Sequence, residues 1–115
     1  MRRVLLIVVV IVAAGCDSDR SSFGNAARGR ELVERHRCQA CHVVPGVTPI
    51  AGTTAPSLAR FARREAIAGK TPNTPANLAA YLESPRDVNP AGTMPDLQIP
   101  PEDARDLAAF LTTLR

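Results

Sequence analysis

The stretch Cys38-Gln39-Ala40-Cys41-His42 decides how this chain of 115 residues folds. Its two cysteines stand three positions apart, and a histidine follows the second one directly. On a helical turn, thiols at this spacing can each form a thioether to one vinyl-derived carbon of a porphyrin. The adjacent histidine then lies under the ring, where its Nε2 atom can bind iron. Cys-x-x-Cys-His is the attachment sequence of such a covalent haem.

A Cys-x-x-Cys pair also occurs in redox disulfides, structural disulfides and zinc sites. A zinc site would need further ligands, and besides His42 only His36 and carboxylates remain, with no second cysteine pair. A thioredoxin-like redox site would need a strand–helix fold, which the sequence pattern does not indicate. A structural disulfide remains the third alternative. We predict one covalent haem c, bound through Cys38, Cys41 and His42.

The iron of that haem has a sixth position, for which the sequence offers Met94. Met94 is the single methionine left once a leader carrying Met1 is removed, and it lies in a proline-rich loop. A lone methionine is often a core gap-filler, but a loop can carry a thioether across the haem. The rival ligand is His36. It stands six residues before His42 on the same expected helix, which is a poor position for reaching the opposite face of the ring.

Outward from the motif, the pattern is one of helices and loops, so the expected fold class is all-α. Asn25 and Thr74 are expected to cap helices. Residues 43–56 and 85–101 are rich in proline and are expected to be irregular loops. Gly29 costs about 1 kcal/mol relative to alanine inside a helix, so we expect it to serve close packing. The expected helices span about 26–37, 57–64, 75–83 and the stretch from Pro101.

The first fifteen residues are expected to be a signal peptide. Two arginines precede an unbroken apolar run, Val4 to Ala14, which is too short for a membrane-spanning helix of about 20 residues. Residues 13–16, Ala-Ala-Gly-Cys, then resemble the bacterial lipobox, although Ala13 stands where leucine is usual. The resemblance implies that Cys16 is lipidated and becomes the first mature residue. Ordinary secretion is the alternative.

These features divide the chain into a signal peptide at 1–15, a lipidated cysteine and tether at 16–24, and one domain at 25–115. The resemblance places the protein on the periplasmic side of a bacterial membrane, held by its lipid. Asp17 resembles the signal that retains enterobacterial lipoproteins at the inner membrane. Haem is attached to exported proteins in this compartment, which agrees with the motif.

The net charge of +3 is largely a property of the leader. Loss of Arg2 and Arg3 leaves 12 basic and 11 acidic residues. The single lysine and the 3% aromatic content argue against nucleic-acid binding. The porphyrin would supply the missing aromatic bulk of the core. Six arginines could ring the haem edge and steer an acidic partner, or could be solvated helix faces: Arg28, Arg30, Arg35, Arg37, Arg60 and Arg63.

From about residue 25 to 115, the chain resembles class I c-type cytochromes. It is most similar to the cytochrome c domain fused to subunit II of some haem–copper oxidases. The resemblance implies a small all-α helical bundle around one covalently attached haem. The stretches that carry it are Cys38–Gly46, Ala55–Leu58, Arg64 with Ala66–Gly69, Asn73–Leu78, and Ser84-Pro85 ahead of Met94-Pro95.

The resemblance also implies roles for residues outside the motif. The carbonyl of Pro56 would accept a hydrogen bond from the Nδ1 atom of His42. Tyr81, at a position where close relatives usually have tryptophan, would approach a haem propionate. Arg64 and Asn77 are further propionate candidates. Their alternatives are a solvated arginine and an ordinary helix asparagine.

Two ligands that remain on the iron through its redox change leave no open site for a substrate. We therefore predict an electron carrier of the respiratory chain and not an enzyme. The expected donor is a quinol-oxidising complex or a small cytochrome, and the resemblance makes a terminal oxidase the expected acceptor. Two alternatives stay open: a haem enzyme or gas sensor in which Met94 is displaceable, and a fixed cytochrome subunit of a larger complex.

Overall fold

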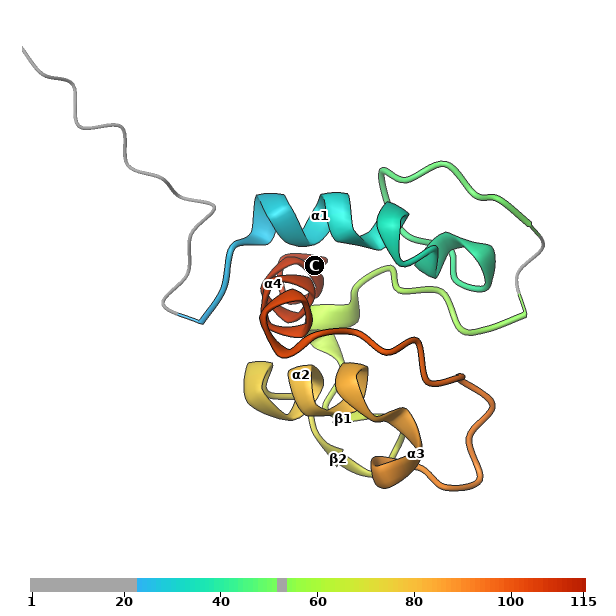
Figure 1. Ribbon diagram of the computed structural model, residues 1–115, viewed down its shortest axis with the longest axis vertical. Helices are drawn as coiled ribbons and strands as arrows, with labels where there is room; N and C mark the ends of the chain where they lie inside the picture. Colours follow the sequence, from blue (N-terminus) through green and yellow to red (C-terminus); the bar gives the residue numbers. More distant parts are fainter. Residues whose placement is uncertain (1–22, 52–53) are drawn as a thin grey trace, which may run out of the picture.

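The computed structural model describes residues 23–51 and 54–115. The predicted signal peptide and Cys16 lie outside the described residues. The elements, shown in Figure 1, are α1 (Ala26–Arg35), η1 (Cys38–Ala40), η2 (Phe61–Arg63), β1 (Ala66–Ile67), β2 (Thr71–Pro72), α2 (Pro75–Glu83), α3 (Pro85–Val88) and α4 (Pro101–Leu111). Helices make up nearly all of the regular secondary structure in the described residues, so the prediction of an all-α fold is confirmed.

The helix starts follow the local signals in the sequence. The side chain of Asn25 accepts a hydrogen bond from the backbone N–H of Arg28 at 3.0 Å, which caps α1. The hydroxyl of Thr74 accepts from the N–H of Asn77 at 3.2 Å and caps α2. Each satisfies a donor that the first helical turn leaves without an intrahelical partner. Both caps stand where the sequence predicted them.

Three expectations about helix extent were wrong. Helix α1 ends at Arg35 and not at 37, because Arg37 has a φ of 58° in the left-handed region. The helix expected at 57–64 is only the short turn η2, since Arg60 also has a positive φ of 56°. The expected loop at 85–101 begins with the one-turn helix α3, in which Pro85 occupies the first position.

A two-stranded antiparallel ribbon interrupts the helices, although the sequence showed no strand pattern. Ala66 pairs with Pro72, and Ile67 pairs with Thr71. The turn between them includes Gly69, whose φ of +65° suits a residue without a Cβ. Each strand has two residues, which is too short to produce an alternating pattern that a sequence could reveal.

The crossing of α1 over α4 organises the bundle (Figure 1). Gly29 lies at the crossing, where a Cβ atom would come within 2.0 Å of the backbone oxygen of Asp106. It would also lie 2.8 Å from the Cβ of Phe110. No side chain fits between the two backbones, so the expectation that Gly29 serves close packing is confirmed.

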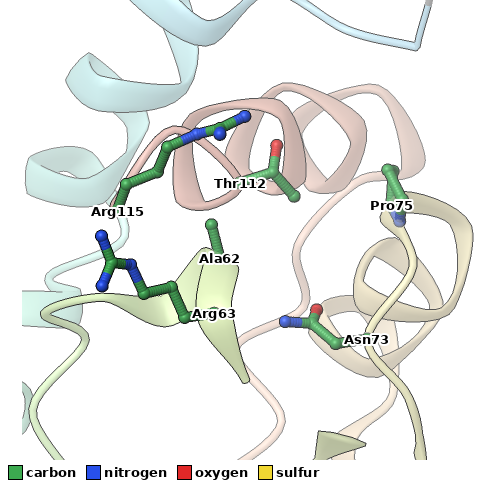
Figure 2. A pocket seen from close by; sticks show the side chains of 6 residues that line it. All are labelled: Ala62, Arg63, Asn73, Pro75, Thr112 and Arg115. Carbon is green, nitrogen blue, oxygen red and sulfur yellow. The ribbon is translucent and has the colours of Figure 1, made fainter. Parts of the chain in front are cut away.

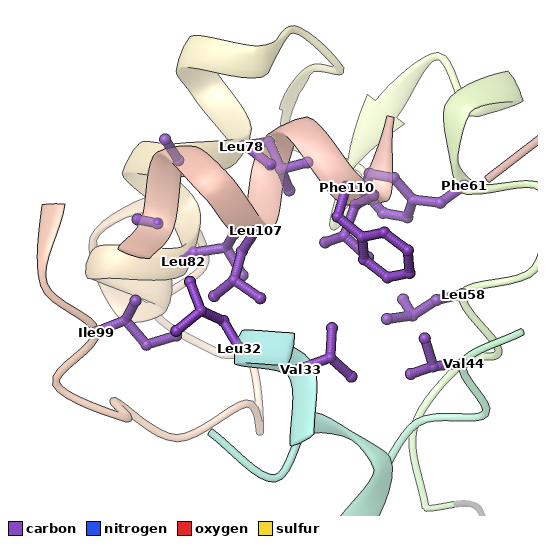
Figure 3. Close-up of a cluster of buried hydrophobic side chains, with 14 of the residues drawn as sticks. Leu32, Val33, Val44, Leu58, Phe61, Leu78, Leu82, Ile99, Leu107 and Phe110 are labelled. Carbon is purple, nitrogen blue, oxygen red and sulfur yellow. The ribbon is translucent and has the colours of Figure 1, made fainter. Parts of the chain in front are cut away.

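The core lies around α4, with α1 on one side and α2 on the other. Figure 3 shows the largest buried side chains meeting there. Leu32 of α1, Leu78 of α2 and Leu107 of α4 are at most 1% exposed. Phe61 of η2 and Phe110 of α4 add the aromatic bulk. Each buried aliphatic side chain of this size contributes about 1.5–3 kcal/mol relative to an exposed one.

A polar cluster closes the α1–α4 interface beside this core. Asp103 accepts from Nη2 of Arg28 at 2.6 Å and lies 3.0 Å, through its other oxygen, from Nε2 of His36. Asp106 accepts from Nη1 of Arg28 at 2.5 Å and from the backbone N–H of Asn25 at 2.7 Å. The hydrogen bond with His36, followed by that with Arg28, lowers the pKa of Asp103. The hydrogen bonds to Asp106 and Asp103 raise the pKa of Arg28.

Within residues 23–51 and 54–115, no helix has the length and apolar character needed to cross a membrane.

The polar cluster predicts an acid-sensitive contribution to stability. Because the pKa of Asp103 is lower in the folded protein, the unfolded state binds more protons as the pH falls. The contribution is therefore present above the unfolded pKa of about 3.9 and is lost as the pH falls through the lower folded value. Asp103→Asn should lower the urea midpoint of the holoprotein near neutrality and flatten its decline below about pH 4.

Glu102→Gln is the matched control. Glu102 stands in the same first turn of α4, but it is exposed and makes no ion pair within the described residues. It should keep the wild-type pH dependence. Equal flattening in both variants would show that the helix terminus, and not the ion pairs of Asp103, carries the effect.

Candidate haem-attachment site

The Cys38–His42 motif occupies the turn that follows α1. Cys38 begins η1, and its carbonyl accepts hydrogen bonds from the N–H groups of Cys41 at 3.2 Å and His42 at 3.0 Å. Cys38 is half-buried against the core and Cys41 is exposed. Burial raises the pKa of the Cys38 thiol to about 11. The turn thus presents two thiols of different exposure ahead of the histidine.

The structure bears on two alternatives for this motif. Cys38 and Cys41 are both free, so the turn holds no disulfide. In the described part of the chain, no group of three His, Cys, Asp or Glu side chains could hold a metal ion. A zinc site therefore finds no ligand set there.

The imidazole of His42 is oriented by a backbone carbonyl. Its Nδ1 atom lies 2.6 Å from the oxygen of Pro56. A carbonyl oxygen can only accept, so Nδ1 carries the hydrogen, and in the neutral imidazole Nε2 is then the nitrogen with the lone pair. In a metal-binding histidine, a hydrogen bond at the nitrogen that does not bind the metal fixes the tautomer and the direction of the ring. This is the contact that the resemblance implied for Pro56.

The segment that carries Pro56 is fastened to the motif from both sides. The N–H of Ala55 donates to Cys41 at 3.1 Å, and the N–H of Leu58 donates to Val43 at 2.8 Å. Between them, Nη2 of Arg64 donates to the carbonyl of Ser57. The position of the Pro56 carbonyl therefore depends on the hydrogen bonds of its neighbours Ala55, Ser57 and Leu58.

Met94 lies in the connection between α3 and α4. It is half-buried and packs against the core cluster, as do Cys38 and Tyr81. Figure 1 shows this connection and the turn η1 on the same side of α4. Ile99, near its end, is 4% exposed and anchors the connection in the core. The fold thus brings the predicted thioether and the predicted thiol to one cluster.

The other predicted residues have different environments. Tyr81 is half-buried on α2, and burial raises the pKa of its hydroxyl. The side-chain amide of Asn77 donates to the carbonyl of Pro72 at 3.0 Å, so it fastens α2 to β2. The guanidinium of Arg64 lies 5.1 Å from the ring centre of Phe61. His36, the rival ligand, is held by Asp103 on α4.

Two further polar residues make or lack contacts that the sequence did not predict. Gln39, between the cysteines, is 7% exposed, and its Oε1 atom has no hydrogen-bond partner in the described structure. Asn73 donates from Nδ2 to the carbonyls of Phe61 and Arg64, both at 3.1 Å. Asn73 stands directly before the Thr74–Pro75 cap. That position was the one available signal that it belongs to an ordered turn.

A surface pocket of about 370 Å³ lies elsewhere in the bundle (Figure 2). Its lining comes from η2, the start of α2 and the end of the chain: Ala62, Arg63, Asn73, Pro75, Thr112 and Arg115. None of the predicted haem residues contributes to it. The candidate site is therefore defined by the donor groups of the motif and not by this pocket.

The donor groups fit a covalently attached haem. The turn offers two free thiols at the required spacing, followed by an imidazole whose Nε2 lone pair is available for iron. A half-buried thioether, Met94, belongs to the same apolar cluster as Cys38. Imidazole and thioether are the ligand pair of cytochromes c.

Comparison with known proteins agrees with this chemistry. The chain is 34% identical over 91 residues to cytochrome c oxidase subunit 2 of Alkalihalophilus pseudofirmus. It is 35% identical over 71 residues to the protein of that name from Bacillus subtilis. These alignments cover 78% and 60% of this chain, but the chain spans only 26% and 20% of those relatives.

A second kind of relative matches over nearly its whole length. The chain is 28% identical over 108 residues to cytochrome c-552 of Bradyrhizobium diazoefficiens, covering 94% of this chain and 92% of that one. The family model described as Cytochrome c matches residues 26–115, which is the helical domain that holds the motif. The chain therefore belongs to the cytochrome c family, whose members are electron carriers with a covalently bound haem c.

Proposed function

We propose that this protein carries single electrons through one haem c bound by Cys38 and Cys41, with His42 and Met94 as the iron ligands. The observation that carries the proposal is the geometry of His42. Its Nδ1–H is bound to Pro56 at 2.6 Å, so the Nε2 lone pair is directed by the fold. The two free thiols of the same turn supply the covalent attachment.

When bound, the haem supplies an iron centre that takes up and releases one electron. The chain's residues determine how easily it does so. A neutral thioether such as that of Met94 raises the potential relative to a second histidine. The buried side chains of the core exclude water, which also affects the potential. Because the protein would supply both iron ligands, no coordination position would be left for a substrate.

The contact between Asp103 and His36 supports Met94 as the sixth ligand, because it holds the rival ligand His36 against α4. The carboxylate of Asp103 lies 3.0 Å from the Nε2 atom of His36, one of the two ring nitrogens that could bind iron. His36 is thereby directed to α4. Met94 lies in the connection between α3 and α4, which is held near its ends by Ile99 and by the turn at Asn89 and on which Met94 itself packs against the core. Tyr81, which packs on the same cluster, is our proposed propionate neighbour.

The ligand assignment predicts the behaviour of Met94→Ala. The haem should stay attached, because both cysteines are unchanged. The charge-transfer absorption of the sulfur–iron bond should disappear from the oxidised protein, the potential should fall, and the reduced protein should bind carbon monoxide.

Leu97→Ala is the matched control for that variant. Leu97 is half-buried on the same connection and packs on the same core, but it has no atom that binds iron. It should retain the sulfur–iron absorption. A wild-type protein that lacks this absorption and binds carbon monoxide would favour a haem enzyme or gas sensor instead.

We further propose that Cys16 carries lipid and tethers the domain to the periplasmic face of the bacterial inner membrane. The lipobox-like residues 13–16 and Asp17 support this proposal. Residues 17–24 are short and polar, so they would keep the domain near the membrane surface.

Cys16→Ala tests the tether. The variant should leave the membrane fraction or retain an uncleaved leader, whereas the wild type should sediment with membranes and carry acyl chains by mass spectrometry. Ser18→Ala, two positions away, is the control and should behave like the wild type. Release of the unmodified wild type into the soluble fraction would contradict lipidation.

The proposed redox partners are a quinol-oxidising complex or small cytochrome as donor and a terminal oxidase as acceptor. The likeness to oxidase subunit 2 supports the acceptor. Arg28 was expected to be part of the basic docking surface for this acceptor. We leave it out of that surface, because its guanidinium binds Asp103 and Asp106. The exposed arginines that remain for steering an acidic partner are Arg30, Arg35, Arg37, Arg60 and Arg63.

The acceptor is tested with membranes that contain or lack the terminal oxidase. Reduced protein should be reoxidised only by the oxidase-containing membranes, and more slowly as salt screens the arginines. Arg35→Gln with Arg37→Gln should slow the reaction, whereas Lys70→Gln on the turn between β1 and β2 should not. Reoxidation at the same rate without oxidase would contradict this acceptor, and stoichiometric copurification would identify a fixed subunit.

A further inference from the structure

We propose that Arg64 is a positioning residue for the iron ligand His42, acting through the backbone of the Pro56–Ser57 segment. This inference rests on the proposed ligation by His42. It assigns to Arg64 a different task from contact with a haem propionate.

Two hydrogen bonds to neighbouring backbone carbonyls connect Arg64 with His42. Nη2 of Arg64 donates to the carbonyl of Ser57. The preceding carbonyl, that of Pro56, accepts from Nδ1 of His42 at 2.6 Å. The two carbonyls belong to consecutive peptide planes that meet at the Cα atom of Ser57, so a fixed Ser57 carbonyl leaves only the two backbone torsions of Ser57 through which the Pro56 carbonyl can turn.

The side chain and backbone of Arg64 are themselves held in place by neighbouring residues. Its guanidinium lies over the ring of buried Phe61, with 5.1 Å to the ring centre. Its backbone N–H donates to Phe61 at 3.1 Å, and its carbonyl accepts from Nδ2 of Asn73 at 3.1 Å. A guanidinium already held over an aromatic ring loses little further freedom when it donates a hydrogen bond.

The segment at Pro56 and Ser57 has few contacts of its own, so a hydrogen bond from the side chain of Arg64 helps to hold it. Pro56 and Ser57 are exposed, and Pro56 has no N–H with which to fasten itself. The N–H of Ala55 holds the segment on one side, and the N–H of Leu58, which shares a peptide plane with the Ser57 carbonyl, donates to Val43 at 2.8 Å. In the described structure, Arg64 is the one side chain that donates a hydrogen bond to the Ser57 carbonyl, so it holds the other edge of that peptide plane.

The consequence falls on the imidazole. A well-aligned acceptor at Nδ1–H makes the imidazole a stronger base at Nε2, which favours ferric iron. Loss of Arg64 should loosen the acceptor, expose the Nδ1–H to water and raise the potential. Loss of a positive charge alone acts in the opposite direction, because it favours ferric iron and lowers the potential.

The experiment compares Arg64→Gln with Arg63→Gln in the holoprotein. Both variants remove one positive charge, but the side chain of Arg63 is exposed and has no hydrogen bond within the described residues. In the ferrous protein, solvent exchange of the His42 Nδ1–H is measured by nitrogen-15 NMR. Exchange should accelerate about tenfold in Arg64→Gln, equivalent to about 1.4 kcal/mol. It should stay at the wild-type rate in Arg63→Gln.

Arg64→Lys supplies the rescue. It keeps the charge and one donor, so its exchange rate should lie between those of the wild type and Arg64→Gln. The potential of Arg64→Gln should lie above that of Arg63→Gln. Wild-type exchange in Arg64→Gln, or equal potentials in the two glutamine variants, would overturn the proposal. Unchanged exchange with a newly pH-dependent potential would instead indicate a propionate contact and also overturn it.

The sulfur–iron absorption separates this result from the ligation itself. If it is present in the wild type while exchange is unaffected in Arg64→Gln, the role of Arg64 is wrong and the proposed ligands stand. If no His42 Nδ1–H resonance shows iron binding in the wild type, both proposals fail together.

Discussion

The close approach of α1 and α4 at Gly29 is the constraint on which the rest of the domain depends. A Cβ atom there would lie 2.0 Å from the Asp106 oxygen, so the two backbones are in contact. The motif begins three residues beyond the end of α1, and its position is therefore set by this crossing. Because Cys38 packs on the same core as α4, the haem attachment is part of the bundle and not an appendage to it.

The crossing also separates the tasks of two histidines that are only six residues apart. Asp103 on α4 meets His36, whereas the irregular segment at Pro56 meets His42. One imidazole faces a carboxylate, and the other faces a carbonyl that accepts the hydrogen of its Nδ1 atom. Arg28 compensates the second carboxylate on α4 at the same interface.

What the sequence predicted well was encoded within a few residues. The motif, the caps at Asn25 and Thr74 and the start of α4 each depend on neighbours along the chain. The partners of His36 could not be predicted in this way, because Asp103 is 67 positions away. The one-turn helix α3 and the two-residue strands are shorter than any periodic pattern. The contact of Pro56 with His42 came from family resemblance, since nothing in the local sequence indicates it.

The surroundings of His42 combine a neutral acceptor with a charged group that is set further away. A charged partner buried directly beside His42 would have to lose its hydration, which costs free energy. The fold instead places a neutral carbonyl beside His42 and keeps the charged guanidinium of Arg64 one peptide away, over Phe61. Charge at that distance orients the backbone without being buried against the ligand. Arginine suits this position because its planar group can stack and donate at once, which the ammonium of lysine cannot do.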